Sequence, residues 1–425
     1  MPEGSKNRRP RGRGLRHARQ RFSGGHRIRL LENGIEFFPA LIAAIDAAQV
    51  SVHLETYIFN DDASGQQVAR ALADAAARGV QVRVVVDGFG TIALTGEVAA
   101  IIAASRVEVR VFRPFHTIIG MRLRVLRRLH RKVGLIDAAE AFVGGINILD
   151  DRVDPNHGAL VAPRFDFAVQ VTGPLVHSVG QTLQQVWEQS EPLPTQTVSV
   201  PGSIESLSPT PGRAADDGRI AMGGVVPAGQ VFDSLMAAFV QRDNLRYRRT
   251  IERIYLRAIG RARREVLIAC AYFLPGRRFG RALCAAARRG VRVRLLLQGR
   301  VEYRLPYFGS LALYESLLRA GVEIIEYRPS FLHAKVAIAD DWATVGSANL
   351  DPFSLLLARE ANVVVHSREF AQALRMRLES AIATGGRPVE LVEIERQPLL
   401  KRLLTRVAWW FMRIGVALSG SGLRY

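Results

Sequence analysis

The sequence predicts an α/β protein built from two similar halves, each a mixed sheet flanked by helices. One observation is a motif, H-x-K-x-x-x-x-D, that begins at His130 and again at His333. A second is that the segments ahead of the motif also repeat, since residues 70–88 (RALADAAARGVQVRVVVDG) match residues 281–299 (RALCAAARRGVRVRLLLQG). A third is that strand-like and helix-like stretches alternate along the chain, which favours a parallel or mixed sheet with helices on its faces.

The first half contains a continuous series of such elements. A strand and turn at 28–34 come before an amphipathic helix at 37–49. An alanine-rich helix follows at 66–78, and Gly79 ends it. Apolar runs bounded by charged or turn residues predict strands at 51–59, 80–88 and 107–114. Each motif then predicts one more short strand, which begins at its lysine.

The second half repeats this order. Its helices are expected at 251–264 and 311–320, its strands at 265–273 and 322–327, and a helix followed by a strand within 281–299. Between the halves, residues 191–229 are rich in Pro, Ser, Thr and Gly, which predicts a surface linker. The expected organisation is therefore a disordered basic arm at 1–25, lobes at 26–190 and 230–390 joined by the linker at 191–229, and a tail at 391–425.

Composition limits the class of protein and of partner. The chain has 425 residues and is 48% hydrophobic, which is enough for a large core. It carries 58 basic and 39 acidic residues, a formal net charge of +19, so an anionic partner is expected, either nucleic acid or an acidic membrane surface. Its two cysteines show no metal-site spacing, and we expect no metal. No signal peptide and no run of about 18 apolar residues is evident.

The spacing within the motif places a histidine beside a lysine. Residues i and i+2 of a strand point to the same face, so His130 and Lys132 project together, as do His333 and Lys335. If the two copies pack together, they form a pocket with two imidazoles and two ammonium groups. Such a pocket suits a phosphodiester, because the cations hold its oxygens while one histidine attacks phosphorus and the other protonates the leaving alcohol. A single H-x-K occurs often by chance, but two full copies favour a functional site.

Two basic, partly apolar stretches indicate contact with a membrane. Residues 121–132 (MRLRVLRRLHRK) lead into the first motif and could guide an anionic headgroup inward, or could simply be a solvated charged face. Residues 399–418 combine three arginines on one side of a helix with apolar and tryptophan side chains, a pattern typical of an interfacial helix. A terminal helix docked on the protein is the alternative. The expected membrane contacts are Arg127, Arg128, Trp409 and Trp410.

The two motifs, their order and the repeated scaffold resemble the phospholipase D superfamily over about residues 26–385. Within that superfamily the sequence is most similar to bacterial cardiolipin synthases of the short, peripheral type. The segments that carry the resemblance are HLETYIF (53–59), HRKVGLID (130–137), AFVGGIN (141–147), VGSANLDPFSL (345–355) and EAN (360–362). The resemblance implies two phospholipase D-like lobes about a pseudo-twofold axis, with one shared active site and neither metal nor cofactor.

The resemblance also implies the reaction and the roles of residues. The expected reaction makes cardiolipin from two phosphatidylglycerol molecules and releases glycerol, through a phosphatidyl-histidine intermediate. On this resemblance we expect His130 to be the nucleophile and His333 to be the acid and base, although the pseudo-symmetric pattern also allows the reverse. The phosphoryl oxygens are expected to bind Lys132, Lys335, Asn147, Asn349 and the Ser347 hydroxyl. Asp137 and Asp340 are expected to orient the histidines, with Glu55 and Glu360 as further candidates for a supporting role.

The expected partners are phosphatidylglycerol and anionic membrane lipids, without obligatory nucleic acid. The expected location is peripheral, on the cytoplasmic face of the bacterial inner membrane. Two alternatives use the same residues: a hydrolytic phospholipase D, in which water attacks the intermediate, and a nuclease of the same superfamily, which the net charge would suit. A nucleic-acid-binding module without enzymatic activity would leave both motifs unexplained.

Overall fold

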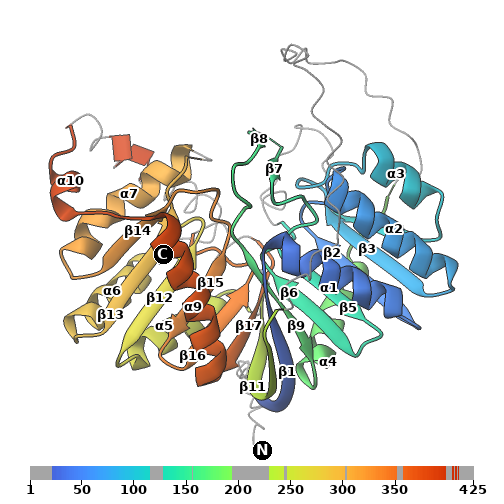
Figure 1. The fold of residues 1–425 in the computed structure, drawn as a ribbon, viewed down its shortest axis with the longest axis horizontal. Coiled ribbons are helices and arrows are strands. Elements are labelled where there is room, and N and C mark those ends of the chain that lie inside the picture. The colour runs from blue at the N-terminus through green and yellow to red at the C-terminus, as the bar shows by residue number, and fades with distance from the viewer. Residues whose placement is uncertain are drawn as a thin grey trace, which may run out of the picture.

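The two repeated halves form one continuous sheet. The computed structural model describes residues 22–114, 128–155, 157–193, 229–243, 247–301, 304–351 and 358–398, together with 404, 405, 407, 408 and 410. Within these residues, 16 strands lie in the order β10-β4-β3-β2-β5-β6-β9-β1-β11-β17-β16-β15-β12-β13-β14-β18 (Figure 1). The order outward from β1 matches the order outward from β11, so the fold has the pseudo-twofold arrangement expected of a duplicated chain.

The N-terminal lobe has three parallel strands beside three antiparallel ones. β2, β3 and β4 run parallel, and β5, β6 and β9 continue the sheet in antiparallel pairs towards β1. The bounds are β1 (Ser23–Glu32), α1 (Asn33–Ala47), β2 (Ser51–Thr56), α2 (Ala63–Ala77), β3 (Gln81–Asp87), α3 (Gly96–Ala103), β4 (Glu108–Phe112), β5 (Lys132–Ile136), β6 (Glu140–Gly144), β7 (Val153–Asp154), β8 (Gly158–Ala159), β9 (Phe167–Thr172), α4 (Leu175–Trp187) and β10 (Glu191–Pro192).

The C-terminal lobe repeats this layout. β12, β13 and β14 run parallel, and β15, β16 and β17 lead back to β11. The bounds are β11 (Val231–Arg242), α5 (Thr250–Arg261), β12 (Glu265–Cys270), α6 (Arg277–Arg288), β13 (Arg292–Gln298), α7 (Arg304–Leu318), β14 (Glu323–Tyr327), β15 (Lys335–Ala339), β16 (Trp342–Gly346), β17 (Glu360–His366), α9 (Arg368–Gly385), β18 (Gly386–Pro388) and α10 (Leu391–Glu395).

Local sequence signals explain where the repeated helices stop. Gly79, just after α2, has φ +92°, and Gly290, just after α6, has φ +87°. These are left-handed conformations that glycine adopts without the steric cost of a Cβ atom. The matched segments therefore turn at the same point and enter equivalent strands, β3 and β13, in the same direction.

The lobes share a hydrophobic core across the junction. β1 pairs antiparallel with β11, from Ser23 opposite Ala237 to Arg29 opposite Val231. The largest buried cluster includes Val143 of β6 in the first lobe and Val345 of β16 in the second. Because apolar side chains from both lobes are removed from water in one cluster, the two lobes are fixed against each other.

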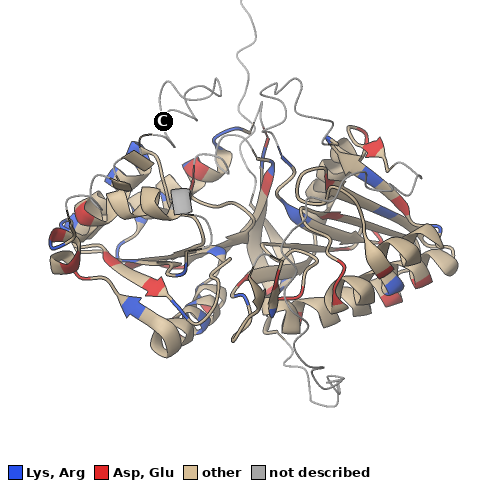
Figure 2. Ribbon diagram, turned by 90° about the horizontal axis from the view of Figure 1, so that it is seen from above, with Lys and Arg blue, Asp and Glu red and all other residues tan. Residues whose placement is uncertain are grey.

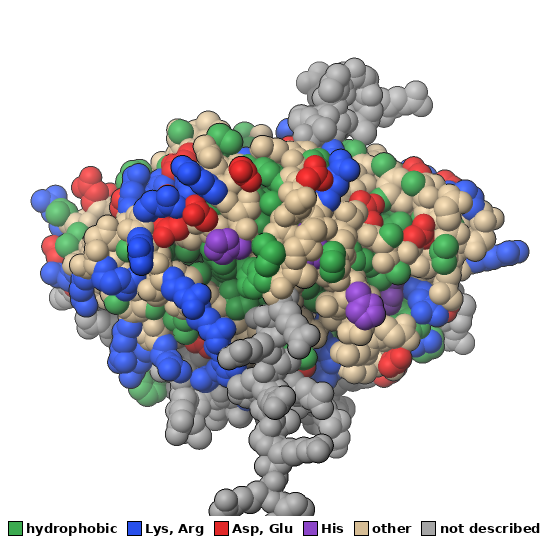
Figure 3. Space-filling model, turned by 90° about the horizontal axis from the view of Figure 1, so that it is seen from below, with side chains coloured by type: hydrophobic (Ala, Val, Ile, Leu, Met, Phe, Trp, Pro, Cys, Tyr) green, Lys and Arg blue, Asp and Glu red, His purple; other side chains and the backbone are tan. Residues whose placement is uncertain are grey.

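The carboxyl ends of the parallel strands and the starts of β5 and β15 lie at one edge of the sheet. Figure 2 views this edge from above and shows basic and acidic residues close together near the junction of the lobes. The opposite edge, in Figure 3, carries many Lys and Arg side chains over the C-terminal lobe. Arg261, Arg263 and Arg289 there line a shallow depression of about 740 Å³. The positive charge is thus spread over both ends of the molecule.

The structure confirms the predicted α/β fold of two repeated lobes and corrects some boundaries. β1 begins at Ser23, inside the range expected for the disordered arm, and α3 is a helix that the sequence analysis did not predict. Most of the linker, residues 194–228, lies outside the described residues, as does most of the arm. Among the helices that are described, none is both long enough and apolar enough to cross a bilayer.

Candidate active site

The two motif histidines lie at the junction, in segments that pair with the opposite lobe. The His130 backbone N–H donates to the Arg359 carbonyl at 3.0 Å, just before β17. Reciprocally, the His333 N–H donates to the Phe165 carbonyl at 2.8 Å, just before β9. The two histidines therefore enter one site from opposite lobes, as the duplicated motif predicts.

Each imidazole is held by a carboxylate of the other lobe. The His130 Nδ1 lies 3.0 Å from Glu360 Oε1, and the His333 Nδ1 lies 2.6 Å from Asp166 Oδ2. A carboxylate accepts a hydrogen bond from Nδ1–H, which favours the tautomer with its proton on Nδ1. The other ring nitrogen, Nε2, then carries the lone pair. This arrangement gives each histidine one atom that can attack phosphorus or exchange a proton.

The two carboxylates are supported differently. The Ser347 hydroxyl donates to Glu360 Oε2 at 2.5 Å and accepts from the Ala361 N–H at 3.0 Å. In the other lobe Gly145 follows the equivalent strand, and a Cβ atom there would lie only 2.4 Å from Asp166 Oδ1. The Ser347 hydroxyl thus donates a hydrogen bond to Glu360, and its donation to a phosphoryl oxygen stays a prediction.

The motif lysines are buried beside the histidines. The Lys132 Nζ donates to the His130 carbonyl at 2.6 Å, and the Lys335 Nζ donates to the His333 carbonyl. Lys132 also lies over the Tyr57 ring, 5.3 Å from its centroid, and Tyr57 packs edge-on against the His130 ring. Both ammonium groups lie close enough to the two histidines to act on them electrostatically, so an anion bound between the histidines would be stabilised.

Two asparagines follow the hairpins that the motif strands form. The Asn147 Oδ1 accepts from the Ile58 N–H at 3.2 Å, and the Asn349 Oδ1 faces the Cys270 thiol at 4.0 Å. In both residues the described contact engages the amide oxygen, so the NH2 group is the part of the side chain that could donate to a phosphoryl oxygen. Asn147 also lines a small cavity of about 20 Å³ with His333, Asp166 and Asn33, large enough for about one water molecule.

Burial and the lysines set the charge of the side chains in the site. Burial lowers the pKa of both histidines, and the lysines lower it further. Burial lowers the pKa of Lys132 to about 7 and raises that of Asp166 to about 6. Burial alone would raise the pKa of Glu360, but His130 and Lys132 hold it below its ordinary value. Both imidazoles are therefore neutral near pH 7, which a nucleophile requires.

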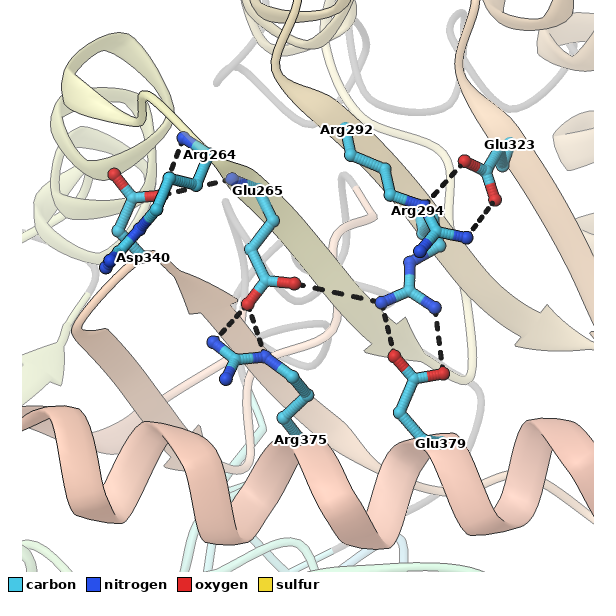
Figure 4. Close-up of polar contacts among 8 residues, drawn as sticks. All are labelled: Arg264, Glu265, Arg292, Arg294, Glu323, Asp340, Arg375 and Glu379. Atoms are coloured by element: carbon cyan, nitrogen blue, oxygen red, sulfur yellow. Dashed lines mark hydrogen bonds and ion pairs between the residues drawn. The ribbon is translucent and has the colours of Figure 1, made fainter.

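The motif aspartates do not orient the histidines, which corrects the sequence expectation. The Asp137 carboxylate accepts the N–H groups of Gln49, Val50 and Ser51 at 2.8–2.9 Å. Asp340 likewise accepts three backbone N–H groups, those of residues 263–265, at the far end of β15 from His333 (Figure 4). A strand of five residues separates each aspartate from its histidine, so these carboxylates tie a hairpin turn to the chain that enters β2 or β12.

Two other expected roles also change. Glu55 forms a buried ion pair with Arg131, with Nε 2.5 Å from Oε2, and does not contact a motif histidine. The Arg128 side chain is largely buried, donates to the Arg113 carbonyl at 3.0 Å and lies 3.7 Å from Asp87, so it is held by the protein instead of facing a membrane. Arg127 and Trp409 lie outside the described residues.

The sequence analysis missed Asp166 and Tyr57. A comparison of the halves contains a signal for Asp166: RFDFAVQV (164–171) and AREANVVV (358–365) both place an acid directly before an apolar strand. Tyr57 has no aromatic counterpart in the other lobe. Glu55 of β2 and Ala269 of β12 hold equivalent positions, so the residue equivalent to Tyr57 is Ala271. No group of His, Cys, Asp or Glu suited to a metal ion occurs within the described part of the chain.

Replacing Asp340 by Ala should lower the free energy of unfolding by about 1–3 kcal/mol, because three N–H groups lose a charged acceptor. The folded variant should keep its kcat within a few-fold. Asp341→Ala is the matched control, since its carboxylate binds only at the surface, to Arg264. Glu360→Gln should instead lower kcat by at least about 10²-fold. Urea unfolding measures the change in stability, and steady-state kinetics measures kcat. A loss of kcat in Asp340→Ala as large as that in Glu360→Gln would contradict a purely structural role for Asp340.

The pKa of Lys132, about 7, predicts a pH dependence for capture of an anionic substrate. Above that pH the free site loses a positive charge, so kcat/KM should fall with rising pH. In the complex the bound anion favours the charged lysine, so kcat should fall at a higher pH than kcat/KM does. Lys132→Arg, which stays charged, should remove the fall in kcat/KM. An unchanged decline in that variant would assign the ionisation to another group.

Comparison with known proteins places this geometry in a family. A family model described as "Cardiolipin synthase, PLD-like domain" matches residues 41–165 and 255–382, and each range contains one motif. The chain is 38% identical to cardiolipin synthase B of Escherichia coli (strain K12) over 397 residues, which cover 93% of this chain and 90% of that one. It is 31% identical to cardiolipin synthase A of Pseudomonas entomophila (strain L48) over 354 residues, or 83% and 68% of the two chains.

A solved structure supports the fold. The crystal structure of a phosphatidylserine synthase from Haemophilus influenzae Rd KW20 matches with a TM-score of 0.65 over 93% of this chain and 94% of that one, at 14% identity. At this identity the likeness concerns the fold alone. The family match over both motif-bearing ranges, together with the near full-length relatives, identifies the chain as a member of the cardiolipin synthase family, whose lobes are phospholipase D-like domains.

Proposed function

We propose that this protein joins two phosphatidylglycerol molecules into cardiolipin and releases glycerol. The observation that carries the proposal is the pair of imidazoles in one site, each with Nδ1 held by a carboxylate of the opposite lobe. Two separate Nε2 atoms allow one histidine to form a covalent bond with phosphorus while the other moves a proton. The two buried lysines supply positive charge where the phosphoryl oxygens gain negative charge.

The reaction has two steps. In the first, the Nε2 of one histidine attacks phosphorus of the first lipid, and the bond from phosphorus to the glycerol oxygen breaks. The second histidine, which takes up a proton on Nε2 from solvent when the anionic lipid binds beside it, gives that proton to the departing oxygen. In the second, the now neutral second histidine takes the proton from a hydroxyl of another phosphatidylglycerol. That oxygen attacks phosphorus, and the phosphorus–nitrogen bond breaks. The protein returns to its starting state with cardiolipin as the product.

We assign His130 as the nucleophile and His333 as the acid and base. Behind His130, the low pKa of Glu360 keeps a carboxylate anionic, which stabilises a positively charged imidazole once its Nε2 is bonded to phosphorus. Behind His333, Asp166 has a pKa of about 6 and can share a proton with the ring. The first environment suits covalent catalysis and the second suits proton transfer.

The described part of the tail supports peripheral contact with an anionic membrane. Residues 404, 405, 407, 408 and 410 are helical. Leu404, Val407 and Trp410 recur every third residue and are 51%, 41% and 62% exposed, whereas Thr405 and Ala408 are buried against the protein. An apolar stripe that faces away from the protein fits an interfacial helix. The proposed location is the cytoplasmic face of the bacterial inner membrane, where the lipid substrates lie.

A lipid product assay tests the function. Purified protein with phosphatidylglycerol as the only lipid should form cardiolipin and glycerol in equal amounts, and phosphatidic acid should be a minor product. His130→Ala and His333→Ala should each lower cardiolipin formation by at least about 10³-fold, because each removes one half of a two-histidine mechanism. Phosphatidic acid as the dominant product would establish hydrolysis instead, and full activity in either variant would exclude a single shared site.

Removing the exposed apolar stripe should weaken membrane binding. Leu404→Gln combined with Trp410→Gln should reduce the fraction that sediments with phosphatidylglycerol vesicles by severalfold, because less apolar surface enters the interface. Val50→Gln is the matched control, since Val50 is 68% exposed but lies at the opposite edge of the sheet, beside Asp137. Equal sedimentation of the stripe variant and the control would place membrane contact elsewhere on the protein.

A further inference from the structure

Arg242 is a buried arginine whose two terminal guanidinium nitrogens have no hydrogen-bond partner among the described residues. It ends β11 and is 1% exposed. Its Nε donates weakly to the Arg248 carbonyl at 3.4 Å, and both terminal nitrogens are buried without a hydrogen-bond partner. An unpaired charge in the interior is costly, so a buried guanidinium of this kind indicates a site for an anion that binds there.

The other buried arginines of the described chain show what is missing. Arg131 forms two hydrogen bonds with Glu55, at 2.5 and 3.0 Å. Arg294 binds both oxygens of Glu379 and lies 3.8 Å from Glu265 (Figure 4). Glu360, Asp351 and Asp243 act on Arg242 electrostatically, but neither terminal nitrogen of Arg242 has a hydrogen-bond partner among the described residues. Its two free nitrogens have the parallel geometry that binds a phosphate in bidentate fashion.

The position of Arg242 places it in the active site. Arg242 lies directly opposite Glu360 in the antiparallel pair of β11 and β17. Opposite residues in such a pair project from the same face of the sheet. Glu360 projects to His130, so Arg242 projects beside the Glu360–His130 pair. The guanidinium is therefore close to the transferred phosphate without being part of either H-x-K motif.

The equivalent position in the other lobe does not repeat this feature. Asn33 is the first residue of α1, directly after β1, and its side-chain oxygen accepts the Asp166 N–H at 3.0 Å. The nearby Arg164 is already paired with Asp154 at 2.5 Å. The site therefore has an unpaired cation on the His130 side and a neutral residue at the matching place on the His333 side.

We propose that Arg242 binds the phosphate of the second, acceptor lipid. This inference rests on the proposed function, in which the acceptor is itself a phosphodiester. Only the three carbons of glycerol separate its attacking hydroxyl from its own phosphate, so the site must hold a second phosphate next to the one being transferred. The two motif lysines and asparagines serve the first phosphate, and Arg242 serves the second.

A partition experiment separates acceptor binding from every earlier step. The full chain is given phosphatidylglycerol with ethanol as a competing acceptor that carries no phosphate. Cardiolipin and phosphatidylethanol then arise from the same covalent intermediate, so their ratio depends only on the acceptors. Arg242→Gln should lower the ratio of cardiolipin to phosphatidylethanol by about tenfold or more, because a charge-assisted bidentate contact is lost. Arg242→Lys should lower it less, since the charge remains.

Arg294→Gln is the matched control, because it also removes a buried arginine but at a distance from the site, and it should leave the ratio at the wild-type value. Melting temperatures check that each variant is folded. If Arg242→Gln lowers both products in proportion, Arg242 acts on the donor or on Glu360, and the proposal is overturned. An unchanged ratio would overturn it as well.

A second measurement keeps the test independent of cardiolipin formation. Glycerol 3-phosphate should inhibit transfer to ethanol more strongly than glycerol does, and Arg242→Gln should abolish that difference. If the wild-type protein made phosphatidylethanol but no cardiolipin, the proposed function would fail, and this inhibition would still decide whether Arg242 binds an anion. Equal inhibition by the two compounds in the wild-type protein would show that it does not.

Discussion

The reciprocal hydrogen bonds between histidine and carboxylate across the junction are the contacts on which the active site depends. His130 receives its partner from β17 of the C-terminal lobe, and His333 receives Asp166 from the segment before β9 of the N-terminal lobe. Neither bond forms unless the lobes keep their register. The β1–β11 pairing and the shared core hold the lobes in that register. The large junction is therefore part of the catalytic apparatus.

The same junction concentrates charge that only a ligand can balance fully. Lys132 and Lys335 are both buried, and each lowers the pKa of the histidine beside it. Glu360 and Asp166 offset part of that charge but are already engaged with the imidazoles. A phosphodiester entering this space replaces water with fixed cations, which do not have to reorganise during the reaction. The stability of the free protein and its affinity for an anion are thus opposed at this site.

The sequence predicted the features that repeat or have strong periodicity. The duplicated motif, the matched helix and strand before it, and the meeting of two histidines and two lysines in one site all follow from spacing that the chain contains twice. Contacts that a side chain makes across the fold were not predicted from the sequence. Asp137 and Asp340 stand in the motif but bind backbone at the far end of a strand, whereas Asp166 is outside it and reaches His333.

The reason for these errors is physical. Sequence spacing reports which face of a strand a residue occupies, but not which residue of the opposite lobe it meets. Arg128 was expected at a membrane because its basic run contains Leu and Val and leads into His130, yet a carbonyl and Asp87 hold it inside the protein. The resemblance implied that Ser347 binds phosphate, and the structure adds that its hydroxyl donates a hydrogen bond to Glu360, 13 residues further along the chain. Each of these depends on long-range contacts between segments far apart in the chain.

Joining the two lobes in a single chain has an evolutionary consequence. In a dimer of identical subunits, any substitution appears on both sides of the site, so the two sides must stay alike. In a fused chain each side mutates separately. Two differences in this protein are of that kind. One lobe has Ser347 beside Glu360 where the other has Gly145 beside Asp166, and one has Arg242 where the other has Asn33. Fusion therefore allows a symmetric scaffold to distinguish between two chemically identical substrates, one that gives up its phosphatidyl group and one that receives it.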